Sequence, residues 1–425
     1  MTSPARRFGR RGTFFAAAAV LALCLWASGA PSVLYPVYAE EWNLTPVVTT
    51  AVFATYPIAL IVVLLLFGGL SDAIGRRRAM LLGIALITVA SVLFAVAPNV
   101  GFLFAGRVVQ GIGTGFALGA ASAALVENNP GGNPRLASSV TTISTSAGLM
   151  LALFLSGVMA QLLPLPMVIS FALLFVLGIV TFTLIWFTPA DTAKDTAKGT
   201  AAGSGSAKSS FAPRIPRVAP GILRAFFLSA LSVSVSYSVG ALVLSLGAQM
   251  ARQLTGTTNL IVVGGLLAFS PLAIGVTALF LSRIRPHVAI LAGAVISLGG
   301  LAVMEATAAS GSLALLLAWC IIGGIGYSFA FTGGLSLINR SAPAQHRGAT
   351  LSLVYLVAYF LQAATAVGAG ALATGLGLRP AIGIIGPVVA VVCIASIALA
   401  VFDLLAKRRA AVPVVGSSSL VKDAA

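Results

Sequence analysis

The sequence has few charged residues, few acids and few cysteines. Charged side chains make up 8% of its 425 residues, whereas a soluble domain carries about a quarter, so the chain cannot build a water-facing surface. The three cysteines, Cys24, Cys320 and Cys393, form an odd and scattered set that fits neither a disulfide framework nor a metal site. His287 and His346 are the only histidines. We expect no enzyme activity and no cofactor, because the sequence offers no Ser-His-Asp set, metal-ligand cluster or phosphate-binding loop.

Twelve apolar runs are long enough to cross a membrane. A spanning helix needs roughly 20 apolar residues, and 59% of the chain is hydrophobic. The first run continues through Tyr35 and Tyr38, which favours a membrane span over a cleaved signal peptide. We predict an all-α membrane protein with spans at 14–39, 46–70, 79–97, 102–126, 136–161, 167–188, 222–250, 258–281, 287–308, 312–338, 349–375 and 380–405.

The net charge of +16 follows from membrane topology. If the N-terminus is cytoplasmic, Arg252 and Arg379 are the only basic residues on the outer side of the predicted spans. This asymmetry obeys the positive-inside rule, and an even number of spans then places both termini in the cytoplasm. We therefore expect a multi-pass protein of the cell inner (plasma) membrane, in contact with the lipid bilayer and without a nucleic-acid partner.

The chain divides into two similar halves. Residues 191–220 are rich in Lys, Thr, Gly, Ser and Pro, a composition typical of a flexible linker. The stretch GIGTGFALGAASAALVENNP from Gly111 matches GIGYSFAFTGGLSLINRSAP from Gly324, at an offset of about 213 residues that indicates an internal repeat. We predict two pseudo-symmetric six-helix bundles, at 1–190 and 221–425, joined by a cytoplasmic linker.

The loop after the second predicted span carries a specific motif. The segment GGLSDAIGRRR resembles the signature loop of the major facilitator superfamily, with matches at Gly68, Asp72, Gly75, Arg76 and Arg77. Ala73 departs from the pattern, because a basic residue is usual there. The resemblance covers the chain from the first to the twelfth predicted helix, and it implies the major facilitator fold.

The resemblance also implies that this loop is a conformational latch. In the family, such a cluster holds the cytoplasmic ends of the two halves together when the transporter faces outward. Glu127 ends the fourth helix on the same side and can pair with Arg76 or Arg77. Asp72 would meet the start of the eleventh helix near Arg347. A basic loop that only fixes topology is the alternative.

A second motif lies in the fourth helix. The segment LFAGRVVQGIGTG resembles a family motif that is associated with proton coupling in antiporters. Its Arg107 lies well inside a predicted span, where a charge costs at least about 2.5 kcal/mol and needs a partner. Glu40 and Glu41 are the first candidates for coupling carboxylates, because they lie on the same side. Alternatively, Arg107 snorkels or braces carbonyls, and both acids are solvated.

The fifth helix resembles a motif of drug antiporters, without its proline. The small residues Gly148, Ala152, Ser156 and Gly157 remain and allow close helix packing. The missing proline weakens the assignment to antiporters.

The fold that the resemblance implies has a cavity lined mainly by helices one, four, seven and ten, so polar and aromatic residues there are the expected substrate contacts: Trp26, Tyr35, Gln110, Tyr237, Trp319 and Tyr327. For each aromatic residue, packing or a place in an interface belt is the alternative. Such a lining suits neutral or lipophilic molecules. We predict a monomeric secondary active transporter that exports hydrophobic or amphiphilic small molecules in exchange for protons. A proton-coupled importer of a neutral solute such as a sugar, and a non-transporting receptor or scaffold, are the alternatives.

Overall fold

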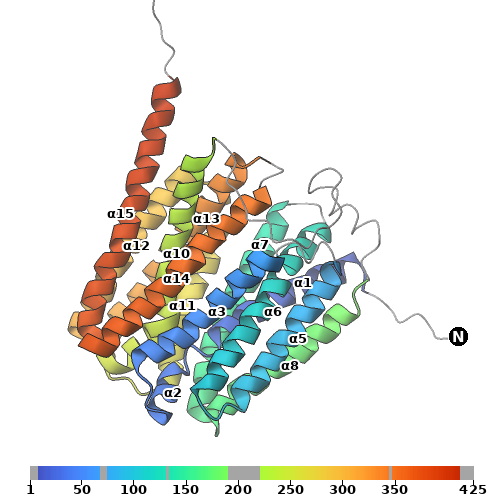
Figure 1. Ribbon diagram of the computed structural model, residues 1–425, viewed down its shortest axis with the longest axis vertical. Coiled ribbons are helices and arrows are strands. Elements are labelled where there is room, and N and C mark those ends of the chain that lie inside the picture. Colours follow the sequence, from blue (N-terminus) through green and yellow to red (C-terminus); the bar gives the residue numbers. More distant parts are fainter. Residues whose placement is uncertain (1–7, 68–73, 131–133, 190–220, 344–346, 412–425) are drawn as a thin grey trace, which may run out of the picture.

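A computed structural model describes residues 8–67, 74–130, 134–189, 221–343 and 347–411 (Figure 1). These residues form helices, and no strand occurs among them. The N-terminal helices are α1 (Arg10–Gly29), α2 (Tyr35–Glu41), α3 (Pro46–Phe67), α5 (Arg76–Ala95), α6 (Val100–Glu127), α7 (Pro134–Leu162) and α8 (Pro166–Trp186). The C-terminal helices are α10 (Leu223–Thr255), α11 (Leu260–Phe280), the 3-10 turn η1 (Leu281–Arg283), α12 (Pro286–Ser310), α13 (Leu313–Ser341), α14 (Arg347–Leu376) and α15 (Leu378–Ala411).

Twelve helices of the described chain are long and apolar enough to span a membrane, which confirms the predicted all-α membrane fold. Each predicted apolar run corresponds to one of them. Large apolar side chains such as Phe280 and Val391 are exposed on the outside, as contact with lipid tails requires. The predicted linker at 191–220 lies outside the described residues, so the predicted domain limits stay a prediction.

The two bundles, α1–α8 and α10–α15, lie side by side (Figure 1) and repeat the same packing details. A Cβ atom on Gly111 of α6 would lie 2.8 Å from the Cβ atom of Ala59 in α3, and one on Gly324 of α13 would lie 2.9 Å from that of Ala273 in α11. Prolines lie inside the partner helices at matching places, Pro57 and Pro271. The absence of a side chain at each glycine therefore lets two backbones approach closely in both halves.

The first span is broken, where the sequence predicted one continuous helix at 14–39. Helix α1 ends at Gly29 and α2 begins at Tyr35. Between them, the amide of Ser32 donates to the carbonyl of Gly29 (2.9 Å) and that of Leu34 to Pro31 (3.0 Å). Pro31 and Pro36 lack an amide hydrogen, and each removes one bond from the helical hydrogen-bond ladder at this point.

The bundles meet mainly through two pairs of helices, α3 with α14 and α7 with α11, and α10 also contacts α2 and α3; Figure 1 shows α3 beside α14. We call the side on which α1 begins and α8 ends the linker side, and the side that carries α2 the far side. Gly157 and Gly264 make backbone contact at the far-side ends of α7 and α11. The amide of Val47 donates to Oγ1 of Thr374 (2.9 Å) at the far-side ends of α3 and α14. The far side is therefore closed by direct contacts between the bundles.

Candidate functional site

Arg107 of α6 is fully buried and is held by the first span. Its Nη1 atom donates to the carbonyl of Ser28 (3.2 Å) and to Oε1 of Gln110 (2.7 Å). Its Nε and Nη2 atoms both donate to the hydroxyl of Tyr35. The guanidinium also lies 5.7 Å from the ring centroid of Tyr56 on α3. The interior therefore stabilises this cation with hydrogen bonds and aromatic rings.

No carboxylate contacts Arg107 among the described residues. The sequence suggested Glu40 and Glu41 because they end the first span on the same side as Arg107. Both side chains are exposed, and Oε1 of Glu40 instead pairs with Nη2 of Arg252 on α10 at 2.7 Å. The two acids therefore do not join the Arg107 site, because α2 directs Glu40 towards the other bundle.

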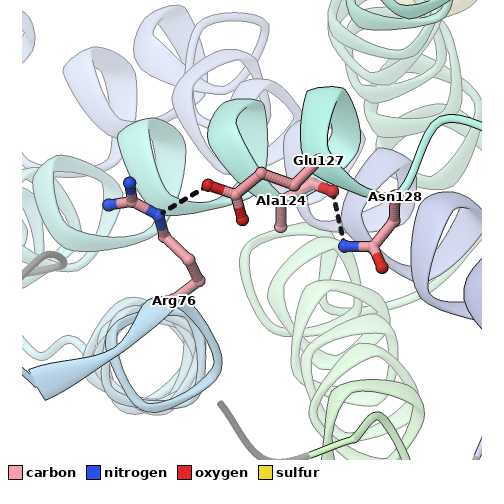
Figure 2. Close-up of polar contacts among 4 residues, drawn as sticks. All are labelled: Arg76, Ala124, Glu127 and Asn128. Atoms are coloured by element: carbon pink, nitrogen blue, oxygen red, sulfur yellow. Dashed lines mark hydrogen bonds and ion pairs between the residues drawn. The ribbon is translucent and has the colours of Figure 1, made fainter. Parts of the chain in front are cut away.

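The signature loop is seen only in part, because Gly68 and Asp72 lie outside the described residues. Gly75 precedes α5 with a φ of 94°, a backbone conformation that favours glycine. Nε of Arg76 lies 3.5 Å from Oε1 of Glu127 (Figure 2). The predicted pairing of Glu127 with this loop is thus present, and it joins α5 to α6 within one bundle.

Two further arginines tie the linker-side ends of the N-terminal bundle together. Nη2 of Arg77 donates to the carbonyl of Trp186 at the end of α8 (2.6 Å), and Nη2 of Arg10 donates to the carbonyl of Glu127 (3.1 Å). Arg347 is the first residue of α14, and its side chain lies outside the described part. The latch role of this set therefore stays a prediction.

Five aromatic rings from three helices form a cluster in the C-terminal bundle. Tyr237 of α10 lies at its centre, with the ring centroid of Tyr359 at 4.7 Å, Phe331 at 6.0 Å, Tyr327 at 6.2 Å and Tyr355 at 6.5 Å. The four outer rings are partly exposed. Tyr355 and Tyr359 lie on α14, which packs against α3 of the other bundle. The cluster therefore extends to the boundary between the bundles.

Sequence reasoning found two of these rings, Tyr237 and Tyr327, and missed the other three. Phe331 lies one helical turn after Tyr327, and Tyr359 one turn after Tyr355, so each pair shares one helix face. That spacing is the signal by which they could have been found. We call Tyr237, Tyr327, Phe331, Tyr355 and Tyr359 the aromatic cluster.

The remaining predicted contacts are spread over other places. Trp319 is fully buried in the core of the C-terminal bundle and takes no part in the aromatic cluster. Trp26 is buried on α1, and its indole nitrogen has no hydrogen-bond partner among the described residues. Of the six predicted contacts, the structure thus joins Tyr35 and Gln110 to Arg107 and brings Tyr237 and Tyr327 together.

The small residues of the fifth predicted helix, now α7, serve two interfaces. A Cβ atom on Gly148 would lie 2.8 Å from Cα of Ala22 in α1. One on Gly157 would lie 3.1 Å from Cα of Gly264 in α11, across the bundle boundary. Ala152 and Ser156 are fully buried between these points. Helix α7 therefore packs closely on both sides, as the small residues predict.

Twelve membrane-spanning helices in two packed bundles, with a buried cation at the core of one, define a multi-pass membrane transporter. The sequence profile of the Major Facilitator Superfamily matches residues 15–304, more than half of the chain. The protein therefore belongs to this superfamily. Family and fold support secondary transport of a small molecule across a membrane.

Individual relatives agree with this assignment. Over 130 residues the chain is 32% identical to an uncharacterized MFS-type transporter, EfpA, of Mycobacterium tuberculosis, which covers 30% of this chain and 24% of the relative. Over 98 residues it is 35% identical to polyol transporter 5 of Arabidopsis thaliana, covering 23% and 18%. These matches therefore span at most a quarter of either relative.

Solved structures match over nearly the whole chain. A variant of the nucleoside transporter NupG has a TM-score of 0.72 at 12% identity and covers 91% of this chain and 99% of its own. The peptide transporter POT in complex with sulfate has a TM-score of 0.71 at 17% identity and covers 92% and 94%. Likeness at such low identity shows a shared fold.

Proposed function

We propose that this protein exports hydrophobic or amphiphilic small molecules in exchange for protons, by alternating access between its two bundles. The observation that carries the substrate class is the aromatic cluster. Five rings gather around Tyr237, and no cation–π contact among the described residues involves them. Partly exposed rings of this kind offer flat apolar surfaces and hydroxyl groups to a substrate.

An anionic substrate would need different residues. Phosphates and dicarboxylates are usually bound by Arg or Lys side chains that make paired hydrogen bonds. Among the described residues Arg107 is the only fully buried arginine or lysine, and its donors already serve Ser28, Tyr35 and Gln110. The arrangement therefore favours neutral or lipophilic molecules over anions.

Proton coupling is supported by Arg107 and by the motif around it. A buried cation changes the free energy of protonating groups in its neighbourhood, and such perturbed sites are typical of coupling centres. Among the described acids only Asp403 is buried, and its Oδ2 lies 2.7 Å from Nε2 of His287 at the linker side. We therefore assign Arg107 a role in coupling and leave the proton-binding group unassigned.

Transport in inside-out vesicles tests the proposal. We would measure accumulation of labelled lipophilic compounds, antibiotics and sugars with and without an acidic lumen, for the wild type, Arg107→Ala and Arg379→Ala. Arg379 is exposed at the start of α15, so its variant controls for the loss of one positive charge. Acid-driven accumulation of a lipophilic compound, lost only in Arg107→Ala, is the expected result.

A proton-coupled importer of a neutral solute is the second candidate. The match to polyol transporter 5 over 98 residues favours it, because hydroxyl-rich and aromatic side chains also suit sugars and polyols. The same vesicles separate the two functions. Release of a preloaded sugar, with no accumulation of any lipophilic compound, would identify the importer and reject the exporter.

A further inference from the structure

We propose that helix α2 connects the Arg107 site to an ion pair that keeps the far side of the transporter closed, with Tyr35 as the positioning residue. The inference concerns the change of conformation and goes beyond the proposed substrate and direction of transport. Helix α2 has seven residues (Tyr35–Glu41) and is therefore about 10 Å long. One of its ends touches the buried cation, and the other end touches the opposite bundle.

At its first residue, α2 is fixed to Arg107. The guanidinium donates to the carbonyl of Ser28 at the end of α1 and to the hydroxyl of Tyr35 at the start of α2. One buried side chain thus bridges the break in the first span. Hydrogen bonds from a charged donor are about twice as strong as neutral ones, so these contacts fix the angle between α1 and α2.

At its other end, α2 reaches across to α10. The 2.7 Å ion pair between Glu40 and Arg252 joins the two bundles. It lies among the far-side contacts, which include the hydrogen bond from the amide of Leu260 on α11 to Oε1 of Gln161 on α7 (2.8 Å). Val33, just before α2, is fully buried and belongs to an apolar core that the C-terminal bundle mainly forms. The position of α2 therefore determines whether Glu40 meets Arg252.

The two contacts are coupled because α2 is short and begins directly after the break. Loss of the Tyr35 hydroxyl frees the start of α2, so Glu40 is no longer held opposite Arg252 and the far-side contacts open more often. A ligand or proton that changes the Arg107 site then changes the far-side ion pair through α2. A purely structural Tyr35 would change stability without changing which side is open.

Cysteine labelling measures this opening. In a background with Cys24, Cys320 and Cys393 replaced by alanine, we would introduce Val33→Cys, which is buried while the far side is closed. The purified protein in lipid nanodiscs is reacted with a maleimide. Tyr35→Phe is compared with Tyr38→Phe, a matched control on the same helix, because the buried Tyr38 hydroxyl has no hydrogen-bond partner among the described residues.

Tyr35→Phe is expected to label about fivefold faster or more, the lower range of coupling between linked sites, while Tyr38→Phe labels at the background rate. Glu40→Gln should give the same increase, whereas Glu41→Gln, which alters an exposed acid with no ion pair in the described chain, should not. Tyr35→Phe should add nothing in the Glu40→Gln background, because both changes break one connection.

The exchanged pair Glu40→Arg with Arg252→Glu should restore slow labelling. A monodisperse size-exclusion profile and a single cooperative thermal transition for each variant would confirm that each protein is folded. Equal labelling of the Tyr35→Phe and Tyr38→Phe proteins would overturn the proposal, as would full additivity of Tyr35→Phe and Glu40→Gln.

Discussion

Arg107 and Gln110 are joined by a hydrogen bond of 2.7 Å between Nη1 and Oε1, one helical turn apart on α6. The amide nitrogen of Gln110 donates in turn to the carbonyl of Ala27 on α1 (2.8 Å). Gln110 is fully buried, so water cannot replace either bond. Gln110 therefore fixes Arg107 against the first span and satisfies a carbonyl of that span at the same time.

The first prediction follows from this pair. Gln110→Leu keeps a similar volume but leaves one donor of Arg107 and the carbonyl of Ala27 without a partner. An unsatisfied buried group costs about 1–3 kcal/mol, so the thermal midpoint of the purified protein should fall and acid-driven transport should decrease. Gln362→Leu is the matched control, because the side-chain oxygen of Gln362 already has no partner among the described residues. Equal effects of both variants would contradict this role of Gln110.

The second prediction concerns the aromatic cluster. Tyr327→Leu removes a ring that lies 6.2 Å from Tyr237 and 5.8 Å from Phe331 but keeps an apolar side chain. An aromatic pair contributes about 0.5–1.5 kcal/mol beyond buried area, so KM for a lipophilic substrate should rise about two- to tenfold. Phe182→Leu, which removes a ring stacked on Trp186, is the control. If Tyr327→Leu transports the substrate with an unchanged KM, the aromatic cluster is not part of the binding site.

The spans could be predicted because membrane thickness requires about 20 apolar residues in succession, and hydrophobicity alone reports that length. The break after Gly29 was missed, although Pro31 and Pro36 mark it. A membrane span can accommodate a proline when neighbouring helices satisfy the freed groups, as α3 does at Pro57. The presence of prolines therefore did not show whether the first span was a kinked helix or two separate helices.

The candidate site could be predicted one helix at a time. Arg107 and Gln110 share a helix, and their spacing of three residues places them on one face. Tyr35, predicted separately as a substrate contact, joins them only through the packing of α2, which the sequence does not specify. Glu40 lies at the same side of the helices as Arg107, as expected, yet α2 directs its carboxylate to Arg252. The sequence therefore did not predict which side chains meet between different helices.

The third prediction uses two neighbouring glycines of α11. A Cβ atom on Gly264 would lie 2.5 Å from the carbonyl oxygen of Leu153 on α7, whereas one on Gly265 would meet only a side-chain atom of Phe154 at 4.0 Å. Gly264→Val should therefore prevent close contact of α7 and α11 and favour a far side that is open. Labelling of Val33→Cys should become faster and transport slower, while Gly265→Val should change neither. Slow labelling in both variants would show that the far side closes without this contact.

The last prediction tests the signature loop. The pair of Arg76 and Glu127 is partly exposed, with 22% and 55% of the side chains accessible, and such pairs contribute about 1 kcal/mol or less to stability. Glu127→Gln should thus leave the thermal midpoint nearly unchanged. If the loop is a latch between conformations, Glu127→Gln and Asp72→Asn should still lower the transport rate.

Both variants are compared with Glu305→Gln, which removes an exposed acid near the far-side end of α12. Quantified membrane levels separate slow transport from poor insertion. Rates equal to that of Glu305→Gln, at equal membrane levels, would show that the loop fixes topology only. A lower rate for Glu127→Gln without a loss of stability would indicate that Glu127 acts in another conformation, because here its carboxylate pairs with Arg76 within its own bundle.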